Sequence, residues 1–132
     1  PVRKVCRGSA QMSGIPEAPI DLMKFAMEIA ADSEVLEDLA ANGDIATLVR
    51  PIDVHFKGSE EAVQALRADV EALGFRFIGF GAYEDGDSAI DLQIDGTTEP
   101  DAMAALTRKA LEIEVSHGVE YDGWGCEAKT KA

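Results

Sequence analysis

The sequence predicts a single α+β domain in which one long helix precedes the element order β-α-β-β-α-β. Apolar residues repeat with helical spacing in three segments, and they alternate with polar residues in four shorter segments. Glycine-containing turns separate several of these segments. A chain of 132 residues has the size of one domain and can bury a core without a metal or a disulfide framework.

The first helix is expected from Ile20 to Asn42, after an irregular N-terminal arm at residues 1–19. Its apolar stripe is interrupted at Asp32, so the pattern fits either one helix of about six turns or two helices with Asp32 as the cap of the second. Gly43 stands where a left-handed residue commonly ends a helix.

The first strand alternates, with Ile52, Val54 and Phe56 on its apolar face. Ser59 is expected to cap the helix that follows, because its hydroxyl can accept a hydrogen bond from an unpaired backbone N–H. That helix is expected to end at Gly74.

Two further strands are expected at residues 75–83 and 89–95. The acidic segment 84–87 between them contains an Asp-Gly pair, which is typical of a hairpin turn. The same segment has the acids of a calcium loop but not its twelve-residue length or its closing glutamate, so the hairpin is the better interpretation.

The last helix is expected to begin at Thr98 as the cap, with Asp101 at the capping-box position, and to end at Gly118. The fourth strand follows from Val119 and contains the only tryptophan, Trp124. This tryptophan can either close the end of the core or act as an exposed contact for a partner.

The order of these elements is the split β-α-β pattern of ferredoxin-like domains, which places both crossover helices on one face of an antiparallel sheet. The opposite face is then available to a partner. The candidate partner-binding residues on that face are Asp53, His55, Asp91, Gln93, Asp95, Glu120 and Asp122. The remaining strand is expected to add Arg76, Ile78 and Phe80 to it.

The formal net charge of −13 bears on the class of partner. No lysine or arginine occurs between Phe77 and Thr107. Such a surface repels phosphate, so direct binding of nucleic acid is not expected, whereas a basic protein surface would be attracted. The alternative is that the acidic face is simply solvated, or that the first helix covers it.

The chain has none of the usual enzyme signatures, namely a nucleophile elbow, a phosphate-binding loop or a dinucleotide fingerprint, so no enzyme activity and no cofactor are expected. A metal site made by His117, Glu120, Asp122 and Cys126 is conceivable, but no pair among them has zinc-site spacing, and none is expected. Cys6 lies far from Cys126 in the sequence, which favours reduced thiols. No apolar run is long enough for a membrane helix, and a cytoplasmic location is expected.

The heptad Val119, Glu120, Tyr121, Asp122, Gly123, Trp124 and Gly125 resembles the closing motif of the RraB family, small acidic bacterial proteins that inhibit ribonuclease E. The resemblance extends over residues 32–125. It implies a protein that binds the non-catalytic scaffold region of ribonuclease E and restrains RNA cleavage without being a nuclease.

The domain is expected to span residues 20–128, and residues 129–132 form a short basic tail where the family carries an acidic one. The alternative function is a ferredoxin-like domain that senses a small molecule, which requires a pocket at a strand end or a dimer interface. A general protein-interaction domain with a different partner is also compatible with the sequence, and the sequence does not determine the oligomeric state.

Overall fold

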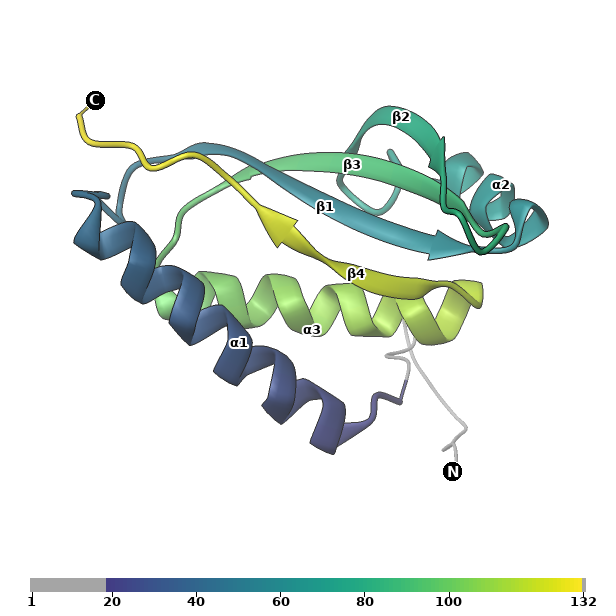
Figure 1. The fold of residues 1–132 in the computed structure, drawn as a ribbon, viewed down its shortest axis with the longest axis horizontal. Coiled ribbons are helices and arrows are strands. Elements are labelled where there is room, and N and C mark those ends of the chain that lie inside the picture. Colours follow the sequence, from purple (N-terminus) through teal and green to yellow (C-terminus); the bar gives the residue numbers. More distant parts are fainter. Residues whose placement is uncertain (1–18, 132) are drawn as a thin grey trace.

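The computed structural model describes residues 19–131 of the chain. The expected N-terminal arm therefore lies, except for Pro19, outside the described residues. The elements are α1 (Leu22–Ala41), β1 (Arg50–Gly58), α2 (Glu60–Asp69), β2 (Arg76–Ala82), β3 (Ser88–Gly96), α3 (Pro100–His117) and β4 (Glu120–Gly125) (Figure 1).

The four strands form one antiparallel sheet in the order β2-β3-β1-β4. The predicted pairing of the strands at Ile52 and Ile90 is confirmed, because β1 and β3 are neighbours along nine residue pairs. The two β-α-β units, β1-α2-β2 and β3-α3-β4, are interleaved in the sheet. Strand β3 lies between β1 and β2, and β1 lies between β3 and β4. The expected α+β class, with a long helix before the sheet, is therefore confirmed.

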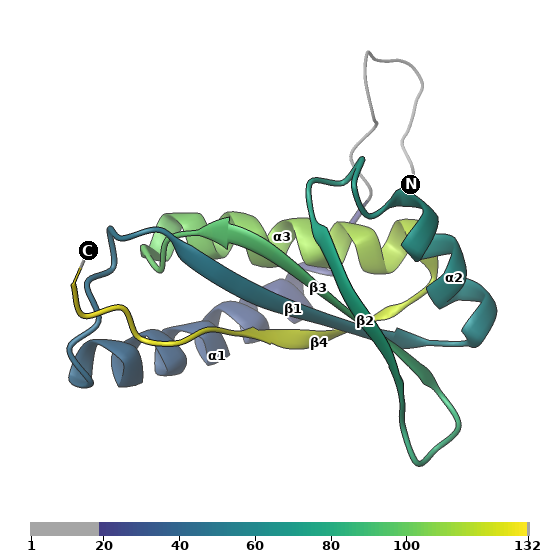
Figure 2. The ribbon, with the colours of Figure 1, turned by 90° about the horizontal axis from the view of Figure 1, so that it is seen from above.

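The helices lie on one face of this sheet and leave the other face open (Figures 1 and 2). The apolar residues of the strands point toward the helices, as their alternation predicts. The core residues from the strands are Ile52, Val54, Phe56, Ile90, Leu92 and Tyr121. The alternative in which the first helix covers the open face is wrong, because α1 packs beside α3 on the opposite side.

The first helix is continuous, so the interpretation as two helices is wrong. Asp21 caps it by accepting hydrogen bonds from the N–H groups of Met23 and Lys24. Asp32 lies in its interior and is only 5% exposed. Its carboxylate is occupied by side chains from other elements, Thr107 and Trp124, and therefore caps nothing.

The last helix begins differently from the prediction. Its N-cap residue is Glu99, which makes no side-chain capping bond, and Pro100 occupies the first turn. The capping box of Thr98 and Asp101 is wrong because the Thr98 hydroxyl is buried and donates to Asp44 instead, at 2.6 Å. By contrast, Ser59 caps α2 as predicted, accepting from Ala62 N.

A bulge in β2 corrects the predicted position of Phe80. The register against β3 shifts between Phe77 and Gly79, so that one extra residue, Ile78, interrupts the alternation. Beyond the bulge, Phe80 pairs with the buried Ile90 and shares its face, toward the helices and away from the open face. Arg76 precedes the bulge and lies on the open face as expected, since it pairs with Gln93.

Candidate partner-binding face

The open face carries all seven predicted candidate residues. On the two central strands Asp53 pairs with Gln93 and His55 with Asp91, in alternation with core residues. The remaining three are Asp95 on β3 and Glu120 and Asp122 on β4. Their position on one face is an observation, and their role in binding stays a prediction.

Side chains on this face form a polar network that crosses three strands. His55 Nδ1 lies 2.8 Å from Asp91 Oδ1. Gln93 donates from its amide to Asp53 at 3.0 Å and accepts from the guanidinium of Arg76 at 2.7 Å. These contacts join β1, β3 and β2 and hold the polar side chains in defined positions over the sheet.

Arg76 also binds the last acid of β3. Its Nη2 donates to Asp95 Oδ1 at 2.9 Å, and this hydrogen bond holds the pKa of the exposed Asp95 carboxyl below its usual value. Both side chains are about half exposed, so the pair is screened by water and adds little to stability. Its effect is to neutralise one of the acids of the face.

The other end of the face is organised around Tyr83, which the sequence analysis did not assign to it. The Tyr83 hydroxyl donates to Asp122, and the hydrogen bond together with burial raises the pKa of Tyr83 to about 12. The Lys57 ammonium lies 4.9 Å from the centre of the tyrosine ring and 3.6 Å from Asp85. The hairpin 84–87 is thereby tied to β1 and β4.

Negative charge remains in excess after these contacts. Five carboxylates of the candidate set share the face with two permanent cations, Lys57 and Arg76. Within residues 19–131 the Glu120 side chain makes no hydrogen bond or ion pair, and Asp53 is met only by a neutral amide. A cationic partner would therefore find acceptors that the fold has not already neutralised.

The part of the face formed by β2 is almost free of side chains. Gly79 pairs with Asp91 and Gly81 with Ala89, so both glycines face the open side. A Cβ atom at Gly79 would meet nothing within 4 Å. Asp91 and the His55 beside it are consequently accessible across the strand.

Two hollows bear on the small-molecule alternative. A shallow groove of about 610 Å³, with polar and apolar lining in nearly equal parts, lies where β1 and β4 meet the C-terminal segment. A more apolar hollow of about 350 Å³ lies between the end of β3 and α3. The residues that line the first groove include Arg50, Pro51, Asp53, Gln93, Cys126 and Lys129. Burial raises the pKa of the Cys126 thiol, which makes it a poor nucleophile.

A buried ion pair that sequence reasoning missed supports this end of the molecule. Arg50 and Asp44 are almost completely buried and form a salt bridge, and Arg50 also donates to the carbonyl oxygens of Ile45 and Leu48. Asp44 additionally accepts from Lys129 N at 2.7 Å. The C-terminal segment, expected to be a basic tail, is thereby joined to the loop after α1.

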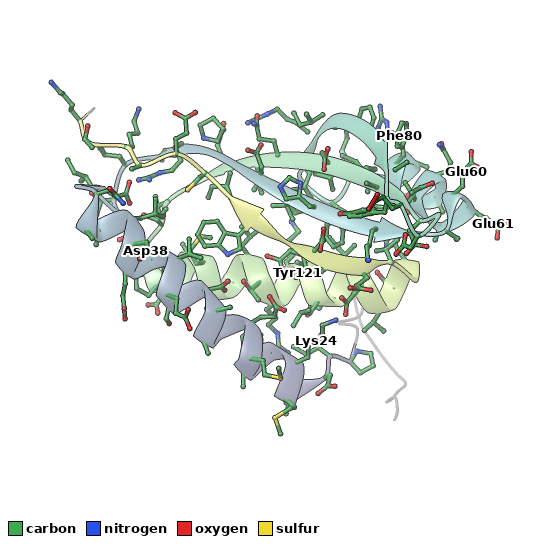
Figure 3. The ribbon with its side chains drawn as sticks, viewed as in Figure 1. Lys24, Asp38, Glu60, Glu61, Phe80 and Tyr121 are labelled. Carbon is green, nitrogen blue, oxygen red and sulfur yellow. The ribbon has the colours of Figure 1, made fainter. Side chains whose placement is uncertain are left out.

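Trp124 lies within β4 and closes the end of the core, which is one of the two roles considered for it from the sequence. It packs against the core on the helix side of the sheet, paired with the buried Val54. Its indole Nε1 donates to Asp32 at 2.8 Å. Tyr121, also on β4, points toward the helices, and Figure 3 shows it between β4 and α3. Trp124 is therefore not an exposed contact for a partner.

The conceivable metal site does not assemble. His117 Nε2 lies 2.8 Å from Asp69 on α2, away from Cys126 at the other end of β4. In the described part of the chain, no three side chains of the metal-binding types come together. Among residues 19–131 no helix is long and apolar enough to cross a membrane.

Comparison with known proteins gives the family. The family model described as "Regulator of ribonuclease activity B" matches residues 29–126. A curated relative, Regulator of ribonuclease activity B from Aeromonas hydrophila subsp. hydrophila, is 28% identical over 111 residues, which cover 80% of this chain and 94% of the relative. The matched region contains the sheet, α2, α3 and most of α1, and the chain therefore belongs to the Regulator of ribonuclease activity B (RraB) family.

Proposed function

We propose that this chain is a non-catalytic, cytoplasmic regulator that binds an endoribonuclease of the ribonuclease E type and inhibits its cleavage of RNA. Family membership supports a regulator of ribonuclease activity. The observation that carries the finer proposal is the acidic open face of the four-stranded antiparallel sheet, with carboxylates such as Glu120 and Asp53 that no cation of the described chain neutralises.

The open face is the proposed contact surface. Association between oppositely charged surfaces is accelerated by their mutual attraction, and buried charge pairs across an interface then fix the orientation. Four of the five candidate carboxylates, all except Glu120, are held by cross-strand hydrogen bonds, so these four lose little side-chain freedom when a basic segment binds them. The expected partner surface is therefore rich in lysine or arginine.

Direct competition for RNA is a poorer explanation of the inhibition. Nucleic-acid affinity depends on cations that displace the counterions of phosphate groups. On the open face Arg76 is paired with Asp95 and Lys57 lies beside Asp85, so a neighbouring carboxylate offsets the attraction of each cation for phosphate. Inhibition would act through the ribonuclease itself.

The test compares two double variants that change the net charge equally. In the first, Asp53→Lys and Asp91→Lys reverse two charges on the open face. In the second, Glu34→Lys and Glu37→Lys reverse two exposed charges on α1, on the other side of the molecule. Association with immobilised ribonuclease E and inhibition of RNA cleavage are measured for both, alongside thermal unfolding.

The sheet variant is expected to associate at least about tenfold more slowly at low salt, and the difference should shrink as salt screens charges over about 10 Å at 0.1 M. The α1 variant should resemble the wild type. Loss of binding in the α1 variant alone would move the contact to α1, where Asp38 also lies (Figure 3). No binding by the wild-type chain would contradict the proposal of a ribonuclease E partner.

A further inference from the structure

We infer that the outer edge of β2 is a docking edge for an extended segment of another protein, one with alternating apolar residues and a basic end. This surface is distinct from the open face, and the inference holds whatever the identity of the ribonuclease. β2 is the terminal strand of the sheet, and within residues 19–131 no strand pairs with its outer side. Such an edge presents unpaired backbone N–H and C=O groups to any chain that can pair with them.

The hairpin fixes which backbone groups point outward. Tyr83 N donates to Asp87 O at 2.8 Å, in continuous register with the pairs formed by Ala82, Gly81 and Phe80. Since inward- and outward-directed pairs alternate along an antiparallel ladder, Gly81 bonds toward β3, whereas Phe80 and Ala82 direct their N–H and C=O groups outward. These two residues are the expected partners of an added strand.

The side chains along this edge are apolar and exposed. Ile78 is 53% exposed and Phe80 is 49% exposed, and the Phe80 ring contacts the Phe77 ring at 4.8 Å between centroids. Figure 3 shows Phe80 at the end of the molecule that carries β2 and α2. The bulge at Ile78 limits regular edge pairing to the residues beyond it. From Gly79 to Ala82 the strand has no lysine, proline or inward charge that would block an added strand.

Charge indicates what kind of chain fits. One end of β2 leads into the acidic hairpin with Glu84, Asp85 and Asp87, and the cation at the other end, Arg76, is engaged by Asp95. A strand with lysine or arginine beside the hairpin would gain attraction along with its backbone bonds. Pairing with a second copy would instead bring together two chains of net charge −13.

The probe is a synthetic peptide of alternating valine and threonine with lysines at both ends. Hydrogen exchange of backbone amides is followed by NMR in the wild-type chain with and without peptide. Saturating peptide is expected to slow the exchange of the Phe80 and Ala82 amides about tenfold or more, because each outward N–H gains an acceptor. The same peptide with glutamates in place of lysines should bind at least about tenfold more weakly.

Two variants and one control locate the site. Ile78→Lys and Ala82→Pro should each weaken binding at least about tenfold, because the first adds a charge to the edge and the second removes an outward N–H. Val115→Lys, which replaces a 50% exposed apolar residue on α3, should leave binding unchanged. If a variant fails to fold, the hydrogen-exchange measurement on the wild-type chain still tests whether the peptide binds the edge of β2.

Three outcomes would overturn the inference. The first is an absence of peptide binding, and the second is binding that protects no amide of β2. The third is a dimer of the wild-type chain, seen by sedimentation and abolished by Ile78→Lys, which would assign the edge to a second copy.

Discussion

The indole Nε1 of Trp124 donates a 2.8 Å hydrogen bond to Asp32 Oδ1, which joins the last strand to the first helix across 92 positions of the chain. The second carboxylate oxygen of Asp32 accepts from the Thr107 hydroxyl at 2.6 Å. One buried carboxylate therefore ties α1 to both β4 and α3. The only tryptophan of the chain therefore has a structural role, because its hydrogen bond holds α1 against the sheet.

We expect Trp124→Phe to lower the free energy of unfolding by about 1–3 kcal/mol, because the buried carboxylate of Asp32 loses one of its two donors. Urea unfolding measures the loss. Asp32→Ala and the double variant complete a double-mutant cycle, in which the coupling should be of similar size. Additive effects of the two single changes would show that the hydrogen bond contributes nothing.

The two glycines beside Trp124 should differ in their tolerance of a side chain. Gly123 has a φ of +97° at the irregularity of the β1–β4 pairing, a backbone conformation that costs other residues about 1–2 kcal/mol. Gly123→Ala is therefore expected to destabilise by about that amount. Gly125→Ala is the matched control, since its added Cβ meets nothing within 4 Å. Equal melting temperatures of the two variants would contradict the expectation.

Acid should weaken the protein through Asp44. Burial raises the pKa of this carboxyl, but hydrogen bonds from Thr98, Lys129 N and Arg50 outweigh burial and lower it. A carboxyl whose folded pKa lies below its unfolded value of about 3.9 contributes stability above that value and loses it as the pH falls through the folded pKa. The contribution is thus present at neutral pH and disappears below about pH 4.

Asp44→Asn should cost about 3–5 kcal/mol near neutral pH, because the buried Arg50 guanidinium loses its counter-charge. The variant should also lose less stability on acidification than the wild type. Urea unfolding at about pH 6 and about pH 3 gives both quantities. Asp38→Asn, an exposed change on α1, serves as the control, and an identical acid dependence in Asp44→Asn and wild type would refute the argument.

Neither tyrosine should ionise near the usual value of about pH 10. The hydrogen bond to Asp122 raises the pKa of Tyr83 to about 12, and burial, with the charges of Asp32 and Glu28, raises that of Tyr121. An absorbance titration of tyrosinate measures both. Asp122→Asn should return one tyrosine toward its ordinary pKa, whereas Glu120→Gln should not. A full tyrosine transition near pH 10 in the wild type would count against the Tyr83–Asp122 contact.

The chain is expected to show no measurable affinity for RNA and no nuclease activity at physiological salt. The reason is the excess of acids on the open face, where phosphate would meet carboxylates. Fluorescence anisotropy with labelled single-stranded RNA, at about 0.15 M salt, measures the affinity. Micromolar binding that falls steeply with added salt would contradict this prediction.

Sequence periodicity predicted the strands and the open face because alternation is a local property. Once Ile52, Val54 and Phe56 are assigned to the core, Asp53 and His55 must lie on the other side. The pairings on that face, such as His55 with Asp91, depend on strand register, which alternation alone does not fix.

The sequence-based predictions were wrong where a side chain bonds a residue distant in sequence, or where a bulge adds one residue to a strand. The residues around Thr98 predict that it caps a helix. In the structure its hydroxyl instead donates a hydrogen bond to Asp44, 54 positions earlier. Asp32 likewise resembles a helix cap in the sequence, because the sequence pattern does not show its hydrogen bond with Trp124. The bulge at Ile78 reverses the alternation and so moves Phe80 to the helix side. Gly79, a glycine inside the strand, was the local signal that could have indicated it.

The bare backbone of β2 on the open face leaves room for new side chains in this protein. Gly79 has empty space where a side chain would begin, and a Cβ at Gly81 would only touch that of Ala89 at 3.5 Å, an ordinary contact. Mutations at these two positions can add new chemistry beside Asp91 without disturbing the core. A descendant of this chain could therefore change the partner that it selects while its fold stays under the same constraints.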